Sequence, residues 1–393
     1  MKTVRADKYC KFVTDGTHDS PKQVNKGRKL ITSKHLSRYG IDFESAKNIS
    51  ELDYQKVISR SKVEQWDILF SMIGTIGNLY LERNHTIEYA CKNMGIFQMG
   101  GDERKAKWLY YYLQTPKARK YIETSGRGTT QSYVPLAALR ALPIDVVDDF
   151  TRDKIIKILW DIDEKILTNM QVNENLEQQA QAYFEELFVV NADPNWPECT
   201  LSDIGSIVAG GTPSKSKSEY YADQGIAWIT PKDLSIDKSK FISHGENDIS
   251  ELGFSKSSTK KMPAGTVLFS SRAPIGYIAI AQNELTTNQG FKSVIPNENI
   301  GTSYVYFLLK NLLPAIEGMA SGSTFKEISG AGMKSVPTVM PDVDTIQLFN
   351  NFCEPIFKEQ EVLEAENRRL STLRDLLLPK LISGEIDVSS LDI

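Results

Sequence analysis

Polar side chains that could contact a nucleic acid gather in short, glycine-flanked loops of this 393-residue sequence. The loops supply hydroxyl, amide and cationic groups, which are the groups that proteins use on phosphates and on the edges of bases. In the first half of the chain the candidates are Thr17, His18, Lys34, His35, Ser71, Arg127, Thr129 and Gln131. In the second half they are Thr212, Lys232, Ser271, Arg272, Thr324 and Lys326.

Several candidates have an equally simple structural interpretation. Thr17 and His18 lie in a polar loop next to a proline, where exposed donors could meet DNA or only satisfy the backbone of a turn. Lys34, His35 and Lys232 follow strand-like segments, so capping of a helix or turn competes with DNA contact. Contact is favoured for the two lysines.

The turns after two predicted buried strands carry Ser71, Ser271 and Arg272. Arg272 is the only arginine in residues 191–341. An arginine can bind guanine through two hydrogen bonds, whereas the structural alternative is a surface ion pair. The remaining candidates lie in Gly/Ser-rich loops that DNA could order on binding: Arg127, Thr129, Gln131, Thr324 and Lys326.

Charge is distributed unevenly along the chain, whose formal net charge is −4. Residues 1–146 contain 24 Lys and Arg against 15 Asp and Glu, and residues 191–341 contain 13 against 14. Residues 147–190 and 342–393 are both acidic, with a net charge of −6 each. The overall charge therefore hides a basic segment of domain size, which suits contact with phosphates.

The sequence repeats itself with an offset close to half its length. The matching pairs, in the same order along both halves, include Gly16-Thr17 with Gly211-Thr212, "LITSKHLS" (30–37) with "WITPKDLS" (228–235), and "DILFSMIGTIGN" (67–78) with "TVLFSSRAPIGY" (266–277). These pairs predict a tandem duplication of a unit of about 195 residues. Two similar domains on one chain suit the reading of two half-sites in DNA.

Each repeat ends in a segment whose seam positions alternate four and three residues apart, as in a coiled coil. The first set is Ile155, Leu159, Ile162, Ile166, Leu176, Ala180, Tyr183 and Leu187. The second set is Phe349, Cys353, Ile356, Gln360, Leu370, Arg374, Leu377 and Leu381. We expect two long helices that pack antiparallel on each other, the alternative being that each helix packs on its own domain.

The ends of these helices are marked by residues that stop or disturb a helix. The first helix should end near Asn191 and Pro194, and the second at Gly384. Pro355 and Pro379 should kink or interrupt the second helix, because proline lacks the backbone N–H. Asn173 and Asn367 fall at the same heptad position, where asparagine fixes the register of a coiled coil at a cost in stability.

The sequence lacks the signatures of several protein classes. No apolar run reaches the roughly 18 residues of a membrane-spanning helix, the N-terminus has no apolar secretory segment, and the four cysteines are scattered. These features favour a cytoplasmic chain with free thiols. Walker A, G-x-G-x-x-G and G-x-S-x-G motifs are absent, as are His and Cys at metal-ligand spacing. The pattern therefore indicates recognition and no catalytic or metal site.

Motifs from both halves resemble the specificity subunits of Type I restriction–modification systems. In the first half these are "DGTHDSPK", "LITSKHL", "DILFSMIGTIGN" and "TSGRGTTQSYV". In the second half they are "GGTPSKSKSEYY", "GIAWITPKDLS", "VLFSSRAPIGYIAIA" and "TTNQGFKSV". The ending "LSTLRDLLLPKLISGEIDV" is similar to the usual C-terminal helix of the family. The resemblance covers essentially the whole chain, although the lead-in before the first Gly-Thr motif is short.

The resemblance implies a mixed α+β fold with two target recognition domains and two antiparallel spacer helices. The corresponding segments are 1–146 and 191–341 for the domains, and 147–190 and 342–393 for the helices. It implies a bipartite double-stranded DNA target and a chain without catalytic activity. S-adenosylmethionine, ATP and Mg are expected in the partners, which are two methylation subunits and the restriction motor subunits. The alternatives are a self-sufficient DNA methyltransferase or nuclease, and a bivalent protein scaffold that does not touch nucleic acid.

Overall fold

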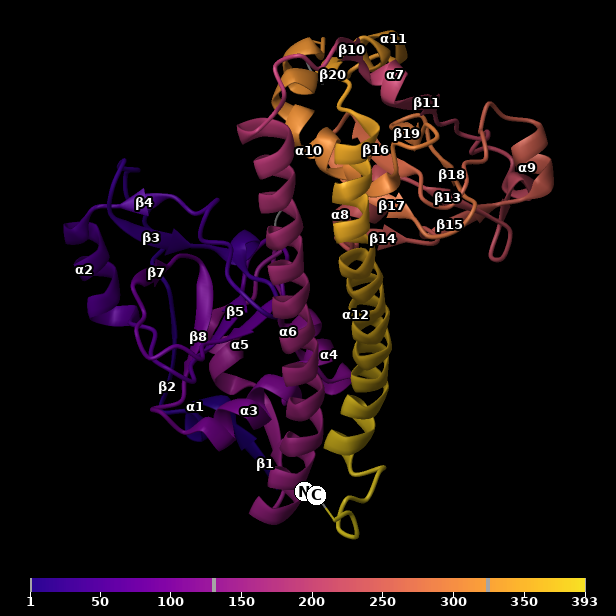
Figure 1. Cartoon of the computed structure of the whole chain (residues 1–393). Coiled ribbons are helices and arrows are strands. Elements are labelled where there is room, and N and C mark those ends of the chain that lie inside the picture. The colour runs from indigo at the N-terminus through magenta and orange to yellow at the C-terminus, as the bar shows by residue number, and fades with distance from the viewer. Residues whose placement is uncertain (1, 129–131, 323–325, 393) are drawn as a thin grey trace. The chain divides into compact units, whose positions relative to one another are not determined.

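The chain folds into two compact units, which Figure 1 displays in the colours of the sequence. Unit 1 consists of residues 1–167 together with 369–393, and unit 2 consists of residues 168–368. The computed structural model describes residues 2–128, 132–322 and 326–392. No helix in the described ranges is long and apolar enough to cross a membrane.

The strands of unit 1 form a central antiparallel sheet and two smaller ones. The central sheet has the order β2-β8-β5-β6, the second has the order β4-β3-β7 with β3 and β7 parallel, and β1 pairs with β9. The strands are β1 (Lys2–Arg5), β2 (Phe12–Asp15), β3 (Arg28–Ile31), β4 (Asn48–Ile49), β5 (Ile68–Ser71), β6 (Leu79–Leu81), β7 (Tyr89–Cys91), β8 (Met94–Gln98) and β9 (Pro143–Val146). The helices are α1 (Ala6–Tyr9), η1 (Ser33–His35), α2 (Glu51–Ser61), α3 (Glu103–Tyr112), α4 (Pro116–Ser125) and α5 (Leu136–Ala141).

The strands of unit 2 have the same plan. The orders are β11-β19-β16-β17-β14 and β12-β15-β13-β18, and β10 pairs with β20. The strands are β10 (Glu198–Thr200), β11 (Gly205–Ala209), β12 (Tyr221–Ala222), β13 (Ile226–Ile229), β14 (Phe241–Ile242), β15 (Asn247–Ile249), β16 (Val267–Ser271), β17 (Ile275–Ala281), β18 (Thr286–Thr287), β19 (Lys292–Pro296) and β20 (Pro337–Val339). The helices are α7 (Leu201–Ile204), η3 (Ser218–Tyr220), α8 (Pro231–Ile236), α9 (Glu251–Ser255), α10 (Thr302–Met319) and α11 (Gly330–Lys334).

The predicted duplication is confirmed by this topology. The order β2-β8-β5-β6 corresponds to β11-β19-β16-β17, and β4-β3-β7 corresponds to β15-β13-β18. The one parallel pair of the smaller sheet, β3 with β7, recurs as β13 with β18. Unit 2 adds β14 and β12 at the sheet edges.

The doubled Leu-Phe-Ser phrase forms the same turn in both units. The amide of Asn78 donates to the Ser71 hydroxyl at 2.7 Å, and the amide of Tyr277 donates to the Ser270 hydroxyl at 2.7 Å. Each hydroxyl donates in turn to the carbonyl four residues after it. Both serines are fully buried. The serine of this phrase therefore closes the turn behind the strand.

Hydrogen bonds correct the predicted pairing of the two Gly-Thr dipeptides by one residue. The amide of Thr17 donates to the carbonyl of Cys91, and the amide of Gly211 donates to that of Thr287, both at 2.9 Å. Cys91 and Thr287 occupy equivalent positions, since each pairs with the isoleucine of the matched "LIT" or "WIT" strand. Thr17 therefore corresponds to Gly211, and not to Thr212.

The shifted pairing also explains the two glycines. A Cβ atom on Gly16 would lie 2.3 Å from the carbonyl oxygen of Cys91, and one on Gly210 would lie 2.5 Å from that of Thr287. Such distances are far below van der Waals contact, so the backbone can cross the end of the neighbouring strand only at a glycine. Matching the two Gly-Thr dipeptides by residue identity gave a pairing that is one residue out, because strand pairing, and not the loop sequence, sets the register of the backbone here.

The two longest helices, α6 (Asp149–Glu185) and α12 (Val343–Ser383), contribute to both units. In unit 1 the buried Ile155 and Leu159 of α6 share an apolar cluster with Leu381 of α12. The C-terminal part of α6 and the N-terminal part of α12 meet in unit 2, where Phe184 lies 5.6 Å from Phe349 between ring centroids. The same clusters contain the strands and helices of each unit, so each helix segment packs both on its partner and on its domain.

Polar pairs across the seam show that the helices are antiparallel within unit 2. The Asn169 amide donates to the Asn367 side chain at 3.0 Å, whereas the Gln360 amide donates to the carbonyl of Asn173 at 3.1 Å. Residues that come later on α6 thus meet residues that come earlier on α12. Asn169 is 1% exposed, so its amide would be unsatisfied in any other register. The predicted antiparallel coiled coil is confirmed.

The helix ends agree with the sequence, but the second helix is not interrupted at its prolines. After α6 a π-helical turn, η2 (Glu186–Val190), is capped by Asn191, and α12 ends before Gly384, whose φ is +78°. However, α12 runs without a break through Pro355 and Pro379. Buried neighbours such as Ile356 and Leu378 pack into the apolar clusters, and this packing offsets the hydrogen bond that each proline omits.

Candidate nucleic-acid interface

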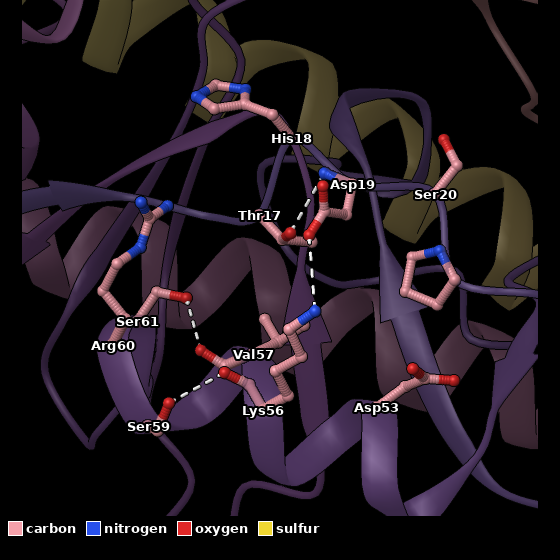
Figure 2. Close-up of a pocket in the computed structure, with 11 residues that line it drawn as sticks. Thr17, His18, Asp19, Ser20, Asp53, Lys56, Val57, Ser59, Arg60 and Ser61 are labelled. Atoms are coloured by element: carbon pink, nitrogen blue, oxygen red, sulfur yellow. Dashed lines mark hydrogen bonds and ion pairs between the residues drawn. The ribbon is translucent and has the colours of Figure 1, made fainter.

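A polar hollow of about 730 Å³ lies in unit 1 between the loop after β2 and helix α2 (Figure 2). The Gly16 crossing described above directs this loop away from β2 and over the helix. Figure 2 shows loop residues Thr17 to Ser20 on one side of the hollow and helix residues Lys56 and Arg60 on the other. The lining residues are Thr17, His18, Asp19, Ser20, Pro21, Asp53, Lys56, Val57, Ser59, Arg60 and Ser61.

Asp15 organises the cationic edge of this hollow. Its carboxylate, which is largely buried, lies 2.9 Å from His18 Nε2 and 3.2 Å from Arg60 Nη2. Arg60 also donates to the carbonyls of Asp15 and Gly16. The other nitrogen of the His18 ring lies 3.0 Å from the Asn93 side-chain oxygen. Arg60 and His18 are thereby held at the rim, while more than half of each side chain stays exposed.

Lys56 is the most accessible cation of the hollow. Its side chain is 76% exposed, and its ammonium lies 3.9 Å from the equally exposed Asp19 carboxylate, as Figure 2 shows. An ion pair of this kind contributes little to stability because water and salt screen it. Lys56 can therefore exchange Asp19 for a phosphate at small cost.

A second hollow in unit 2 brings together two of the predicted residues, Thr212 and Lys232. Thr212 donates to the Gln289 side chain, and Lys232 pairs with Glu246 at 2.5 Å. The hydrogen bond from Lys232 to Glu246 and the charge of that carboxylate raise the pKa of Lys232, which therefore stays protonated at neutral pH. The lining residues are Thr212, Lys215, Tyr221, Trp228, Thr230, Pro231, Lys232, Asp233, Glu246, Asn247, Asn288 and Gln289.

A third hollow, again in unit 1, contains Arg127. It lies between the turn after β5 and the end of α4, and its lining also includes Asn78 and Arg119. The backbone of Arg127 pairs with Tyr133 in both directions at 2.8 Å, so the segment is anchored while the Arg127 side chain is exposed. The candidates Thr129, Gln131 and Thr324 lie outside the described residues. Lys34 and Lys326 are exposed.

The structure buries three of the predicted residues. Ser71 closes its turn, as shown above, and the Ser271 hydroxyl donates to the carbonyl of Gly290 at 3.1 Å. His35 is 4% exposed, and its Nδ1 accepts a hydrogen bond from the Thr32 amide at 2.9 Å. Burial lowers the pKa of His35, so the imidazole is neutral and acts as a cap. These three side chains are structural here, because a buried group cannot reach a nucleic acid.

Arg272 is found in the ion pair that the sequence left as an alternative. Its Nη1 lies 3.3 Å from a carboxylate oxygen of Glu327, and about a third of each side chain is exposed. An exposed pair of this kind does not prevent a further contact, because guanidinium carries five N–H donors.

Lys56, Arg60, Arg119 and Gln289 were missed by sequence reasoning. Lys56 and Arg60 are spaced i,i+4, which places both on one face of α2, and this spacing was an available signal. Their proximity to the loop at Thr17 carried no signal, since it depends on how the loop folds back over α2. In the described ranges, no group of three or more His, Cys, Asp or Glu side chains could hold a metal ion.

Comparison with known proteins identifies the family. The model of the Type I restriction modification DNA specificity domain matches the chain twice, at residues 22–178 and 194–348. The specificity subunit of the type I restriction enzyme MjaIX of Methanocaldococcus jannaschii is 37% identical over 190 residues, which are 46% of this chain and 44% of that protein. The HindI specificity subunit of Haemophilus influenzae is 23% identical over 419 residues, covering 86% of this chain and 90% of that one.

A solved structure shares the fold. The crystal structure of the S subunit of a Type I restriction–modification system from M. genitalium matches with a TM-score of 0.56 and 17% identity, over 97% of this chain and 95% of that chain. The relatives are all named as specificity subunits, which agrees with the expectation that this chain is not itself an enzyme. The family model matches most of the chain, and the resemblance found in the motifs is confirmed: the chain belongs to the Type I restriction modification DNA specificity domain family.

Proposed function

We propose that the chain recognises DNA for a Type I restriction–modification complex, and that each unit reads one half of a bipartite double-stranded site. The observation that carries the proposal is the double match of the specificity-domain family, with one copy on each side of α6's end. Each copy also has a polar hollow beside the loop that follows its first central strand. Two similar recognition units on one chain suit two half-sites.

The side chains of the hollows support nucleic acid as the ligand. Lys56 and Arg60 in unit 1 and Lys232 in unit 2 offer charge to phosphates, and Asn288 and Gln289 offer amides to base edges. The carboxylates that pair with Lys56 and Lys232 are exposed, so a phosphate can replace them. Binding of this kind weakens with salt, with a slope of about −0.9 per neutralised phosphate.

The long helices offer a surface for protein partners. Leu348, Phe352 and Val362 of α12 are 39–54% exposed in unit 2, and Leu373 and Leu376 are 47% and 61% exposed in unit 1. Apolar side chains repeated along one exposed helix indicate docking of another helix. We assign this surface to two methylation subunits, with restriction motor subunits joining the full complex. S-adenosylmethionine, ATP and Mg belong to those subunits, which act with this chain on cytoplasmic DNA.

The test is to map methylated adenines across the genome with and without this gene. The proposal predicts one bipartite motif with a gap of unspecified bases, and predicts that this motif loses methylation when the gene is deleted. The purified chain with S-adenosylmethionine should methylate no DNA by itself. Methyl transfer by the isolated chain would contradict the proposal, as would an unchanged methylation map in the deletion strain that expresses the partner subunits.

A further inference from the structure

One corner of each unit is built from the same backbone contacts. In unit 2 the amide of Ile328 donates to the carbonyl of Ser271 at 3.1 Å, and in unit 1 the amide of Val134 donates to that of Met72 at 2.9 Å. The next residues form the bridges Arg272 with Glu327 and Ile73 with Tyr133. Arg272 of unit 2 therefore occupies the position that Ile73 occupies in unit 1.

The side chains at this corner differ completely between the units. Ile73 and Tyr133 present an uncharged pair, in which Tyr133 is 41% exposed. Arg272 instead faces Glu327 at 3.3 Å, and the other carboxylate oxygen of Glu327 lies 3.6 Å from the ammonium of Lys292. The backbone frame is thus shared, while the chemistry that it presents is not.

Lys292 is the buried member of the polar corner. It is 8% exposed, and its ammonium lies 3.4 Å from both the Ser271 hydroxyl and the carbonyl of Gln289. A buried ammonium needs a charged partner, and Glu327 supplies it. Glu327 is therefore held on one oxygen by a fixed, buried cation and can hold Arg272 with the other.

This arrangement orients the guanidinium of Arg272. Glu327 engages Nη1, and the side chain remains 36% exposed. Arginine has further N–H donors in a planar fork, and two parallel donors match the O6 and N7 acceptors of guanine. A carboxylate on one edge fixes the plane and leaves the other edge available, which lowers the entropy lost on binding.

We propose that Arg272 reads a guanine in the half-site of unit 2, and that Glu327 and Lys292 are its positioning residues. In unit 1 the equivalent position is that of Ile73, whose side chain offers no hydrogen-bond donor. The inference rests on the proposed function, since it requires that the units read DNA. It assigns a base type to one position of a target whose sequence is otherwise open.

The test uses the complex with its methylation subunits, and the readout is methylation of the mapped motif and of oligonucleotides that replace each of its bases. Arg272→Lys keeps the charge but not the fork, and Arg272→Ala removes both. Both should relax the preference for one guanine by about 5- to 150-fold, the discrimination expected of a bidentate contact. If Arg272 met only a phosphate, the lysine variant would keep every base preference, and the proposal would be overturned.

Glu327→Ala and Glu327→Gln test the positioning role. Both should relax the same guanine as Arg272→Lys, and the glutamine variant should do so less, because its amide oxygen can still accept from Arg272. If Glu327 had only a structural role, its substitution would lower methylation at every sequence and leave the base preferences unchanged. This result for Arg272→Lys and Glu327→Gln would also overturn the proposal. Glu284→Gln, which breaks the ion pair with Lys261 at 3.1 Å, is the matched control and should change no base preference.

The same experiment distinguishes a failure of the proposed function from a failure of the assignment of Arg272. A wild-type complex without a bipartite motif would contradict the proposed function itself. A clear wild-type motif that contains no guanine in one half, or whose guanine preferences survive Arg272→Lys, would contradict only the assignment of Arg272.

Discussion

The two units share a strand order but surround the loop after the first central strand with different groups. In unit 1 this loop folds over α2, an 11-residue helix that contributes Lys56 and Arg60 to the hollow. The corresponding helix of unit 2, α9, has five residues and contributes none. The hollow there is lined by amides, by Lys215, and by Lys232, whose charge Glu246 balances. The sheets thus supply a constant frame, and the residues that differ are those that a ligand would meet.

The units also differ in the buried side chains that join residues 1–146 and residues 191–341 to the long helices. In unit 1 the buried Asp163 of α6 accepts hydrogen bonds from Tyr39, Tyr111 and Arg374, each at 2.8 Å. In unit 2 the acid is Glu177, which pairs with Lys310 at 2.6 Å and with the buried Lys240. Each network joins both helices to a loop or helix of its own unit, since Lys240 also donates to Gln360 of α12. Different residues therefore perform the same task at non-equivalent positions.

The largest effect is expected when one recognition part is replaced as a whole. Exchanging residues 191–341 for the corresponding segment of a relative should change one half of the methylated motif and leave the other half intact, because each unit has its own core and its own hollow. Mapping of methylated sites reads out both halves at once. A chimera that altered both halves would show that the units do not read independently.

A second change leaves both recognition parts untouched and lengthens the helices. Inserting seven residues after Leu167 in α6 and seven after Arg368 in α12 preserves the heptad register of the pair. The insertion adds about 10 Å at 1.5 Å per residue, or about three base pairs at 3.4 Å each. We expect the gap between the half-sites to lengthen by about that number while the bases read stay the same.

The matched control for this prediction inserts the heptad in α6 alone. That change leaves the pairs within residues 168–368 in place but shifts the N-terminal part of α6 against the C-terminal part of α12. The buried Arg374 is then displaced from Asp163, so stability should fall and methylation should be weak. If the double insertion were active with an unchanged gap, the helices would not set the distance between half-sites.

The third prediction compares the two buried networks. Arg374→Ala removes a side chain that is 4% exposed and leaves the Asp163 carboxylate with only hydroxyl donors and Arg38, 3.6 Å away. Breaking such a pair should lower the free energy of unfolding by about 3–5 kcal/mol. Lys240→Ala should cost less, since Glu177 keeps Lys310.

Chemical denaturation followed by hydrogen exchange would measure both losses and locate them in unit 1 and unit 2 respectively. Arg369→Ala, at an exposed position of the same helix segment, should change the free energy of unfolding by less than about 0.5 kcal/mol. Equal losses for Arg374→Ala and Arg369→Ala would remove the argument for a buried network.

Sequence reasoning succeeded where the signal is local and periodic. The seam of α6 and α12 follows from residue spacing, and even the polar seam positions Gln360 and Arg374 are buried as predicted. It failed where a contact depends on the path of a loop, as for the ion pair of Arg60 with Asp15. It also failed for a serine at the end of a strand. Ser71 has the residue type of a DNA contact, but its neighbours Asn78 and Thr75 return to it across the turn and use its hydroxyl.

The smallest expected effect tests this reassignment of the serine. Ser71→Ala and Ser270→Ala each remove a hydroxyl that accepts from the amide seven residues later and donates to the carbonyl four residues later. Each should lower the free energy of unfolding by about 1–3 kcal/mol, because a buried amide and carbonyl lose their partner. The two losses should be similar, since the two turns have the same bonds, and neither variant should change a base of the methylated motif. A half-site altered by Ser71→Ala at unchanged stability would return Ser71 to the interface and would mean that the turn opens when the chain binds DNA.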